Sequence, residues 1–175
     1  NYFDSETAPI SAIVNVVTFK EEAKQQLHLL KISREDLATA EYIVDILNAN
    51  GLMDKALDEV ADDMSFHFKK IIETDTISRG LKIVQSLEPV GLGAVSIKEC
   101  LLMQLHSVGI KNVEVEQAIR LLQNHYEDLT QRKFEKLQHA LKIDDKELKK
   151  VLSLIGALNF YPVSETNQHD PKQTI

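Results

Sequence analysis

A proline-glycine segment that ends one helix and leads into another is the feature that most constrains the fold of this chain. Pro89 disfavours helical backbone at the residue before it and cannot continue a preceding helix. Gly91 and Gly93 permit backbone angles that residues with a side chain avoid. We therefore predict a rigid elbow at residues 89–95 between two helical units.

The start of the next helix is specified by the residues that follow the elbow. Ser96 has the side chain preferred at an N-cap, and Glu99, three residues later, completes a capping box. Val95 can pack on Cys100 as a hydrophobic staple across this helix start. The spacing predicts a helix over 97–106.

Apolar residues recur with a helical period along nearly the whole chain, and no segment shows the sustained alternation of a half-buried strand. We predict an all-α fold of two small helical bundles, or lobes, joined by the elbow. N-caps with box partners are expected at Thr18 with Glu21, Ser33 with Asp36, and Asp144 with Glu147. The expected helices cover 19–30, 34 to a stop at Gly51, 56–64 with an irregular continuation to 72, 76–87, 97–106, 113–126, 130–141 and 144–158.

These elements predict two helical lobes, preceded by an N-terminal extension and followed by a tail or linker. The first lobe covers 18–88 and the second covers 96–158, on either side of the elbow at 89–95. An N-terminal extension occupies 1–17, and a tail or linker begins at residue 159, where Asn, Ser, Thr and Pro replace the helical pattern.

The charge of the chain favours a protein partner over a nucleic acid. The net charge is −7. Residues 1–90 carry 9 Lys and Arg against 16 Asp and Glu, whereas residues 91–175 carry 11 of each kind. An acidic first half repels phosphate groups, on which non-specific binding of nucleic acids depends.

A helix-turn-helix DNA-binding regulator stays open as an alternative function. The helices 129–141 and 144–158 have a suitable outline, and the second carries lysines near its start. An earlier pair ending in 56–64 is too acidic to approach phosphates. The other interpretation of the basic residues in these two helices is that they form solvated helix faces. The possible DNA-proximal residues are Lys146, Lys149 and Lys150.

No pattern typical of an enzyme or a cofactor site is found. The six histidines never fall in a His-Glu-x-x-His arrangement, and Gly91 and Gly93 lack the third glycine of a dinucleotide loop. We expect no catalytic residue, metal, cofactor or small-molecule substrate, although an all-α small-molecule sensor remains a further alternative. A single Cys100 excludes an internal disulfide and is expected to be buried.

The apolar run 10–17 is too short to cross a bilayer and has no basic residue before it. A chain with one cysteine, no thiol cluster and no such segment fits a reducing compartment. We therefore expect a cytoplasmic protein with no membrane partner.

The elbow and its helix also resemble the core-binding region of bacterial sigma-54 factors. The resemblance rests on Leu-Glu-Pro-Val-Gly-Leu-Gly-Ala at 87–94, with Ile97, Glu99-Cys-Leu-Leu at 99–102 and Gln104-Leu105. Residues 18–27, 50–53, 56–61 and 155–162 extend it. Val95 stands where the family usually has arginine, and 159–162 lacks the first proline and the following glycine of the family's ending.

The resemblance implies a region that docks a transcription initiation factor on core RNA polymerase. It also implies that the full-length factor engages promoter DNA and an ATP-dependent activator. The family's activator-responsive arm and promoter-reading helix do not occur in this sequence, so we expect a fragment of a divergent member. The candidate partner-binding residues are Gln104, Glu99, Pro89, Gly91 and Gly93, and the polar Gln104 beside an apolar stripe is the leading one.

Overall fold

A computed structural model describes residues 10–164 of the protein, with side chains from residue 18 onward. Over these residues the chain forms nine helices and no strand, which confirms the all-α class. The helices are α1 (Ile10–His28), α2 (Arg34–Ile46), α3 (Leu57–Phe68), α4 (Thr74–Gln85), α5 (Ile97–Ser107), α6 (Val113–Asn124), α7 (Tyr126–Thr130), α8 (Phe134–Leu141) and α9 (Asp145–Gly156).

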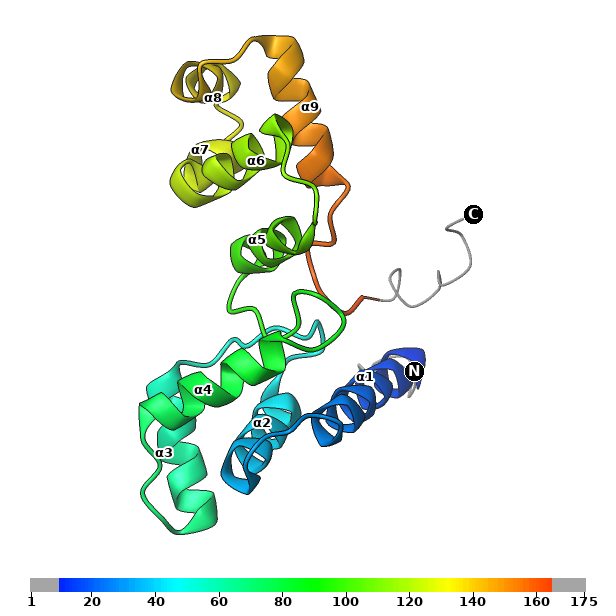
Figure 1. Ribbon diagram of the computed structural model, residues 1–175, viewed down its shortest axis with the longest axis vertical. Coiled ribbons are helices and arrows are strands. Elements are labelled where there is room, and N and C mark those ends of the chain that lie inside the picture. The colour runs from blue at the N-terminus through cyan, green and yellow to red at the C-terminus, as the bar shows by residue number, and fades with distance from the viewer. Residues whose placement is uncertain (1–9, 165–175) are drawn as a thin grey trace, which may run out of the picture.

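The helices form two groups along an elongated molecule (Figure 1). In the first group α2 packs against α1 and α4, and α3 packs against α4. In the second group α6 packs against α5, α7 and α9, while α8 and the start of α9 lie at the far end (Figure 1). Helix α5 is the member of the second group that lies nearest the first group, next to the loops that join them (Figure 1).

Each helical group has a core of its own, built from the apolar stripes of its helices. The larger core draws on α1 to α4 and includes Ile43, Val60 and Val84, all fully buried. The second core includes Leu121, Leu122 and Leu137, which are also fully buried. Each such side chain stabilises the fold by roughly 1.5–3 kcal/mol relative to an exposed position.

Three predicted helix starts are confirmed by their capping geometry. The Ser33 and Ser96 hydroxyl oxygens accept from the backbone N–H of Asp36 and Glu99, each at 3.1 Å. Asp144 and Glu147 form the complete capping box, with distances of 2.7 and 3.0 Å. Local side-chain chemistry fixes these starts because both partners lie within one helical turn.

The predicted start of the first helix is wrong. Helix α1 begins at Ile10, inside the predicted extension, so Thr18 lies within the helix and cannot cap it. Residues 10–17 contain no glycine or proline that would interrupt a helix before residue 18. The helix also ends at His28, two residues before the predicted end at Leu30, which is 40% exposed.

Other helix boundaries differ from the prediction as well, those of α2 and α8 among them. Helix α2 ends at Ile46, and Gly51 lies beyond it in a turn, with φ of +80°, so it is not the helix stop. The expected helix over 130–141 begins only at Phe134, because Arg132 takes a left-handed φ of +56°. The short helix α7 before this break was not predicted.

Residues 159–164 are not helical, but they do not extend away from the fold. Val163 is 5% exposed and belongs to the core of the first helical group. The chain therefore returns from the end of α9 to the other group, as the orange segment of Figure 1 shows. The predicted tail beyond residue 164 and the predicted extension before residue 10 lie outside the described residues.

Candidate partner-binding site

Three chain segments that are far apart in sequence meet where the two helical groups join. We call segments 50–53, 91–94 and 159–163 together the junction. Backbone hydrogen bonds connect the first segment to both others, so the middle of the chain and its later part are held together. These bonds run from Gly93 N–H to Gly51 O (2.9 Å), from Met53 N–H to Ala94 O (2.8 Å) and from Val163 N–H to Asn50 O (3.0 Å).

Two glycines of the junction, Gly91 in the predicted elbow and Gly51 outside it, are required by close packing as well as by backbone angle. Gly91 has φ of +102°, and a Cβ atom there would lie 2.6 Å from Cys100 Sγ. Gly51 has φ of +80°, and its Cβ would lie 2.9 Å from Val163 Cγ2. Both glycines have a left-handed backbone conformation and close neighbours. Any residue with a side chain would therefore have to displace atoms of the junction.

Gly93 shares these constraints, and the proline before it lies at the surface. Gly93 has φ of +78°, with Val84 Cγ1 3.1 Å from the position of a Cβ atom. Pro89 is exposed and follows a cis peptide bond from Glu88. Helix α4 already ends at Gln85, so Pro89 does not end that helix directly.

Glu99 connects the start of α5 to the end of α4. Its Oε1 accepts from Gln85 Nε2 at 2.8 Å, and the same amide donates to Gly93 O at 3.0 Å. Its other oxygen accepts from Val95 N–H at 3.3 Å, so the expected box with Ser96 shifts by one residue. Glu99 is therefore occupied by contacts within the chain.

The predicted staple between Val95 and Cys100 does not form. Val95 is 50% exposed, and fully buried Cys100 instead packs with Leu52 and Ala94. The extended backbone at Ser96 separates the side chains on either side of it. The elbow residue that packs on α5 is thus Ala94.

Gln104, the leading candidate for partner contact, is bonded within the chain at both ends of its amide. Nε2 donates to Asn159 O at 2.6 Å and to Cys100 O at 3.1 Å, and Oε1 accepts from Asn159 N–H at 2.9 Å. Gln26 of α1 makes a similar two-way pair with the backbone of Glu88, at 2.7 and 2.8 Å. Two glutamines therefore hold Asn159 of the junction and Glu88, which lies just before it.

Sequence analysis missed Gln26, Gln85 and Asn159 as parts of this arrangement. Their partners lie up to 62 residues away, and no local pattern relates them. Glutamine on a helix surface usually faces water, so residue type alone gives no signal.

Cys100 is fully buried beside the junction, as expected. Loss of hydration raises the pKa of its thiol from 9.0 to about 11, with a smaller upward effect from the Glu99 carboxylate. A hydrogen bond from Gln104 acts in the opposite direction on this pKa. The thiol therefore stays protonated at neutral pH.

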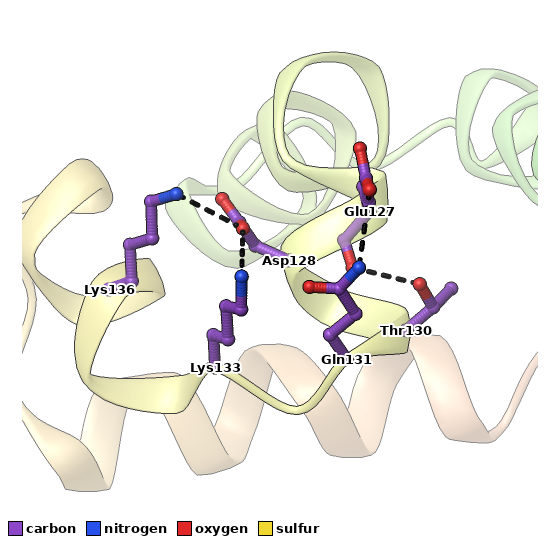
Figure 2. Close-up of polar contacts among 6 residues, drawn as sticks. All are labelled: Glu127, Asp128, Thr130, Gln131, Lys133 and Lys136. Atoms are coloured by element: carbon purple, nitrogen blue, oxygen red, sulfur yellow. Dashed lines mark hydrogen bonds and ion pairs between the residues drawn. The ribbon is translucent and has the colours of Figure 1, made fainter.

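The basic residues of the second group are partly neutralised by nearby carboxylates. In Figure 2, Asp128 of α7 faces Lys133 and Lys136, whose Nζ atoms lie 4.0 and 3.3 Å from its Oδ1. On α9, Lys149 pairs with Asp145 at 3.0 Å. Lys146 and Lys150 are exposed. These ion pairs lower the positive charge that the second helical group can present to phosphate groups.

Several large apolar side chains are exposed at the surface. Phe66 of α3 and Ile71 of the following loop are 88% and 91% exposed. Ile110 and Val113 of the second group are 68% and 67% exposed. The sequence carries a signal for Phe66, because it falls on the polar face of its helix with Asp62 and Asp63.

No deep pocket is seen at either of two surface depressions. One is a wide, open hollow at α8 that includes His139 and Lys142. The other is a small recess between α2 and the end of α3, beside Thr39 and Phe68. Among residues 10–164 no three His, Cys, Asp or Glu side chains converge as metal ligands, and none of the helices there is long and apolar enough to cross a membrane.

The family model and the curated relatives that match this chain agree on one protein family. The family model for the sigma-54 factor, core binding domain, matches residues 10–175. The RNA polymerase sigma-54 factor of Pseudomonas putida KT2440 is 30% identical over 150 residues, 86% of this chain and 30% of that protein. The same-named proteins of Acinetobacter guillouiae and Escherichia coli K12 are 30% and 25% identical, over 90% and 100% of this chain. The chain spans about a third of the length of these relatives.

Proposed function

Because this chain belongs to the family of sigma-54 factor core-binding domains, we propose that it docks a sigma-54-type transcription initiation factor on core RNA polymerase. The observation that carries the proposal is the family match over residues 10–175, which includes every described helix and the whole junction. In the full-length factor, promoter DNA and an ATP-dependent activator are the further partners. The complex then acts in the cytoplasm, and this region performs no catalysis.

The junction supports this function by holding two helical units in one relative orientation. In this proposal the units are residues 18–88 and 96–158, joined by the elbow at 89–95. A pair of linked surfaces binds a large partner more tightly than either alone, because engagement of one raises the effective concentration of the other. A fixed orientation also avoids the entropy cost of ordering the units during binding.

The five candidate residues act in this proposal through the shape of the junction. Gly91 and Gly93 allow the close approach of segments, and Glu99 and Gln104 hold the neighbouring elements by hydrogen bonds. Pro89 restricts the backbone between the two units. Their substitution is expected to weaken polymerase binding by changing the orientation of the units.

A binding assay with purified core RNA polymerase tests the proposed function. The immobilised chain should retain core polymerase, and an unrelated full-length sigma factor should displace it in competition. Gly91→Ala should weaken retention, whereas Gly109→Ala, where an added Cβ meets no atom within 4 Å, should not. Failure of the unmodified chain to retain core polymerase would contradict the proposal.

The alternative functions are not favoured. A DNA-binding regulator using Lys146, Lys149 and Lys150 would bind duplex DNA with a steep salt dependence, which filter binding at two salt concentrations detects. Absence of binding at the lower salt concentration removes that alternative. A small-molecule sensor needs an enclosed site with convergent polar groups, unlike the open hollow at α8.

A further inference from the structure

We propose that Phe66 and Ile71, together with the acidic face of α3 beside them, form a docking surface for a basic and apolar site on core RNA polymerase. We call this set, which includes Glu59, Asp62 and Asp63, the α3 tip surface. The proposal rests on the proposed function and assigns one contact surface to it.

The first argument is the exposure of two large apolar side chains at one end of α3, Phe66 in its last turn and Ile71 in the loop that follows. Phe66 and Ile71 are 88% and 91% exposed, close to the exposure of an unfolded chain. Isolated exposed apolar residues are common, but neighbouring ones mark interaction surfaces more often. Burying both against a partner would remove their apolar area from water and favour association.

The loop that presents these side chains is held by hydrogen bonds. Ser65 Oγ accepts from Ile72 N–H at 2.8 Å and donates to Ala61 O at 2.7 Å. Lys70 N–H donates to Ser65 O at 3.2 Å, after a left-handed turn at Lys69. Ile72 is thereby buried against the first core, and its neighbour Ile71 is directed outward.

Because Ser65 and Ile72 are bonded to each other, Phe66 and Ile71 are the next residues on the two sides of the same loop. Both are therefore presented at one end of α3. A surface with a fixed backbone loses little conformational entropy when a partner binds. The exposure of Phe66 and Ile71 is thus a property of an ordered surface.

The charge of the residues around the loop decides which kind of binding partner this surface fits. Glu59, Asp62 and Asp63 lie seven, four and three residues before Phe66, so they share its helix face, and all three are exposed. None of them forms an ion pair within residues 18–164. Residues 57–75 contain six Asp or Glu and two Lys, the exposed Lys69 and Lys70 between Phe66 and Ile71, so the region keeps a net charge of −4.

An acidic rim disfavours three kinds of occupant. Nucleic-acid phosphates and anionic lipid headgroups are repelled by it. A second copy of this surface would bring two regions of the same charge together, which opposes self-association. The occupant that fits is a protein site with apolar side chains and a basic rim, which the proposed function places on core polymerase.

The test measures the affinity of the full chain for purified core RNA polymerase. The variant Phe66→Ser with Ile71→Ser should raise Kd about tenfold or more, as expected for central apolar contacts. Its thermal unfolding midpoint should stay within about 2 °C of the parent, because both side chains are solvent-exposed. Ile110→Ser, at a comparably exposed apolar residue of the other helical group, is the matched control and should leave Kd nearly unchanged.

A charge variant tests the rim separately. Asp62→Lys with Asp63→Lys should slow association with polymerase, and the effect should shrink at higher salt as the charges are screened. Unchanged affinity in both double variants, or equal losses in these variants and Ile110→Ser, would overturn the proposal while the proposed function stands. No binding by the parent chain would instead contradict the proposed function. Dimerisation of the parent that Phe66→Ser with Ile71→Ser abolishes would assign the surface to a second copy.

Discussion

Gln104 and Asn159 are joined by a pair of hydrogen bonds that run in opposite directions across 55 residues of sequence. The Gln104 amide donates to Asn159 O at 2.6 Å, and Asn159 N–H donates to Gln104 Oε1 at 2.9 Å. The pair attaches the segment after α9 to the middle of α5. From there the chain continues to Val163, in the core of the other helical group.

Replacing Gln104 by alanine should loosen this attachment. The change removes both bonds and leaves the backbone groups of Asn159 to water, which should lower the free energy of unfolding by about 1–2 kcal/mol. Chemical denaturation measures the loss, and amide hydrogen exchange at Asn159 and Val163 should accelerate. Gln138→Ala removes one exposed side-chain bond to Asp145 and serves as the control, expected to be nearly neutral. Equal effects of the two substitutions would contradict the structural role of Gln104.

An alanine at position 91 should destabilise the protein strongly. A φ of +102° strains any residue with a Cβ atom, and that atom would lie 2.6 Å from Cys100 Sγ. Together these effects should lower the free energy of unfolding by about 2–4 kcal/mol. Gly109→Ala, in open space, should change it by less than about 0.5 kcal/mol.

A double-mutant cycle separates steric crowding from backbone strain at Gly91. Cys100→Ala removes the sulfur atom that the new methyl group would approach. The loss of unfolding free energy in the double variant should therefore be smaller, by about 1 kcal/mol or more, than the sum of the losses in the two single variants. Strict additivity would show that crowding against Cys100 contributes nothing.

The Cys100 thiol should react slowly while the protein is folded. Its pKa of about 11, raised from 9.0 by burial, reduces the thiolate fraction at pH 8 by about a hundredfold. A colorimetric thiol reagent should label it slowly in buffer and rapidly in denaturant. Rapid labelling of the folded protein would contradict the burial of this side chain.

The same pKa shift predicts a loss of stability at alkaline pH. The folded state favours the protonated thiol, so its contribution is fully present below pH 9 and is lost as pH rises through about 11. Cys100→Ser has no group that titrates in this window and is the reference. The difference in unfolding free energy between parent and Cys100→Ser should therefore shrink between pH 9 and 11.

The return of the chain at Val163 should fix the orientation of the two helical groups. Spin labels at exposed Lys82→Cys and Ser153→Cys report the distance between α4 and α9, since buried Cys100 reacts slowly. Val163→Asp places a charge in the first core and should broaden the distance distribution. Val113→Asp, at a 67% exposed valine, should leave it unchanged. Similar distributions in both variants would show that the elbow alone sets the orientation.

Helix starts with a local N-cap hydrogen bond were predictable from short stretches of sequence. Ser33, Ser96 and Asp144 each bond to a group three residues away, so composition and spacing suffice to find them. Thr18 has the same pattern but lies within α1, because nothing in residues 10–17 ends the helix. A capping motif therefore predicts a helix start only where the preceding chain leaves the helix.

The candidate site was located by sequence, but its contacts were not. The Pro-Gly segment marked the joint, and the apolar stripes predicted the buried residues on both sides of it. The hydrogen bonds between Gln104 and Asn159 could not be predicted, because Asn159 lies in a segment whose composition is typical of a linker. Phe66 was detectable as an apolar residue on a polar helix face, whereas the outward direction of Ile71 depends on the bond between Ser65 and Ile72.

The amino-acid sequence by itself determined the helical class, the main capped starts and the place of the joint, since these depend on interactions within a few residues. The tertiary structure decided how the joint is closed, by bringing segments 50–53, 91–94 and 159–163 together and occupying Gln104 and Glu99 with internal bonds. It also decided which apolar side chains stay exposed. Such outcomes depend on packing between residues distant in sequence, whose pairing no local pattern specifies.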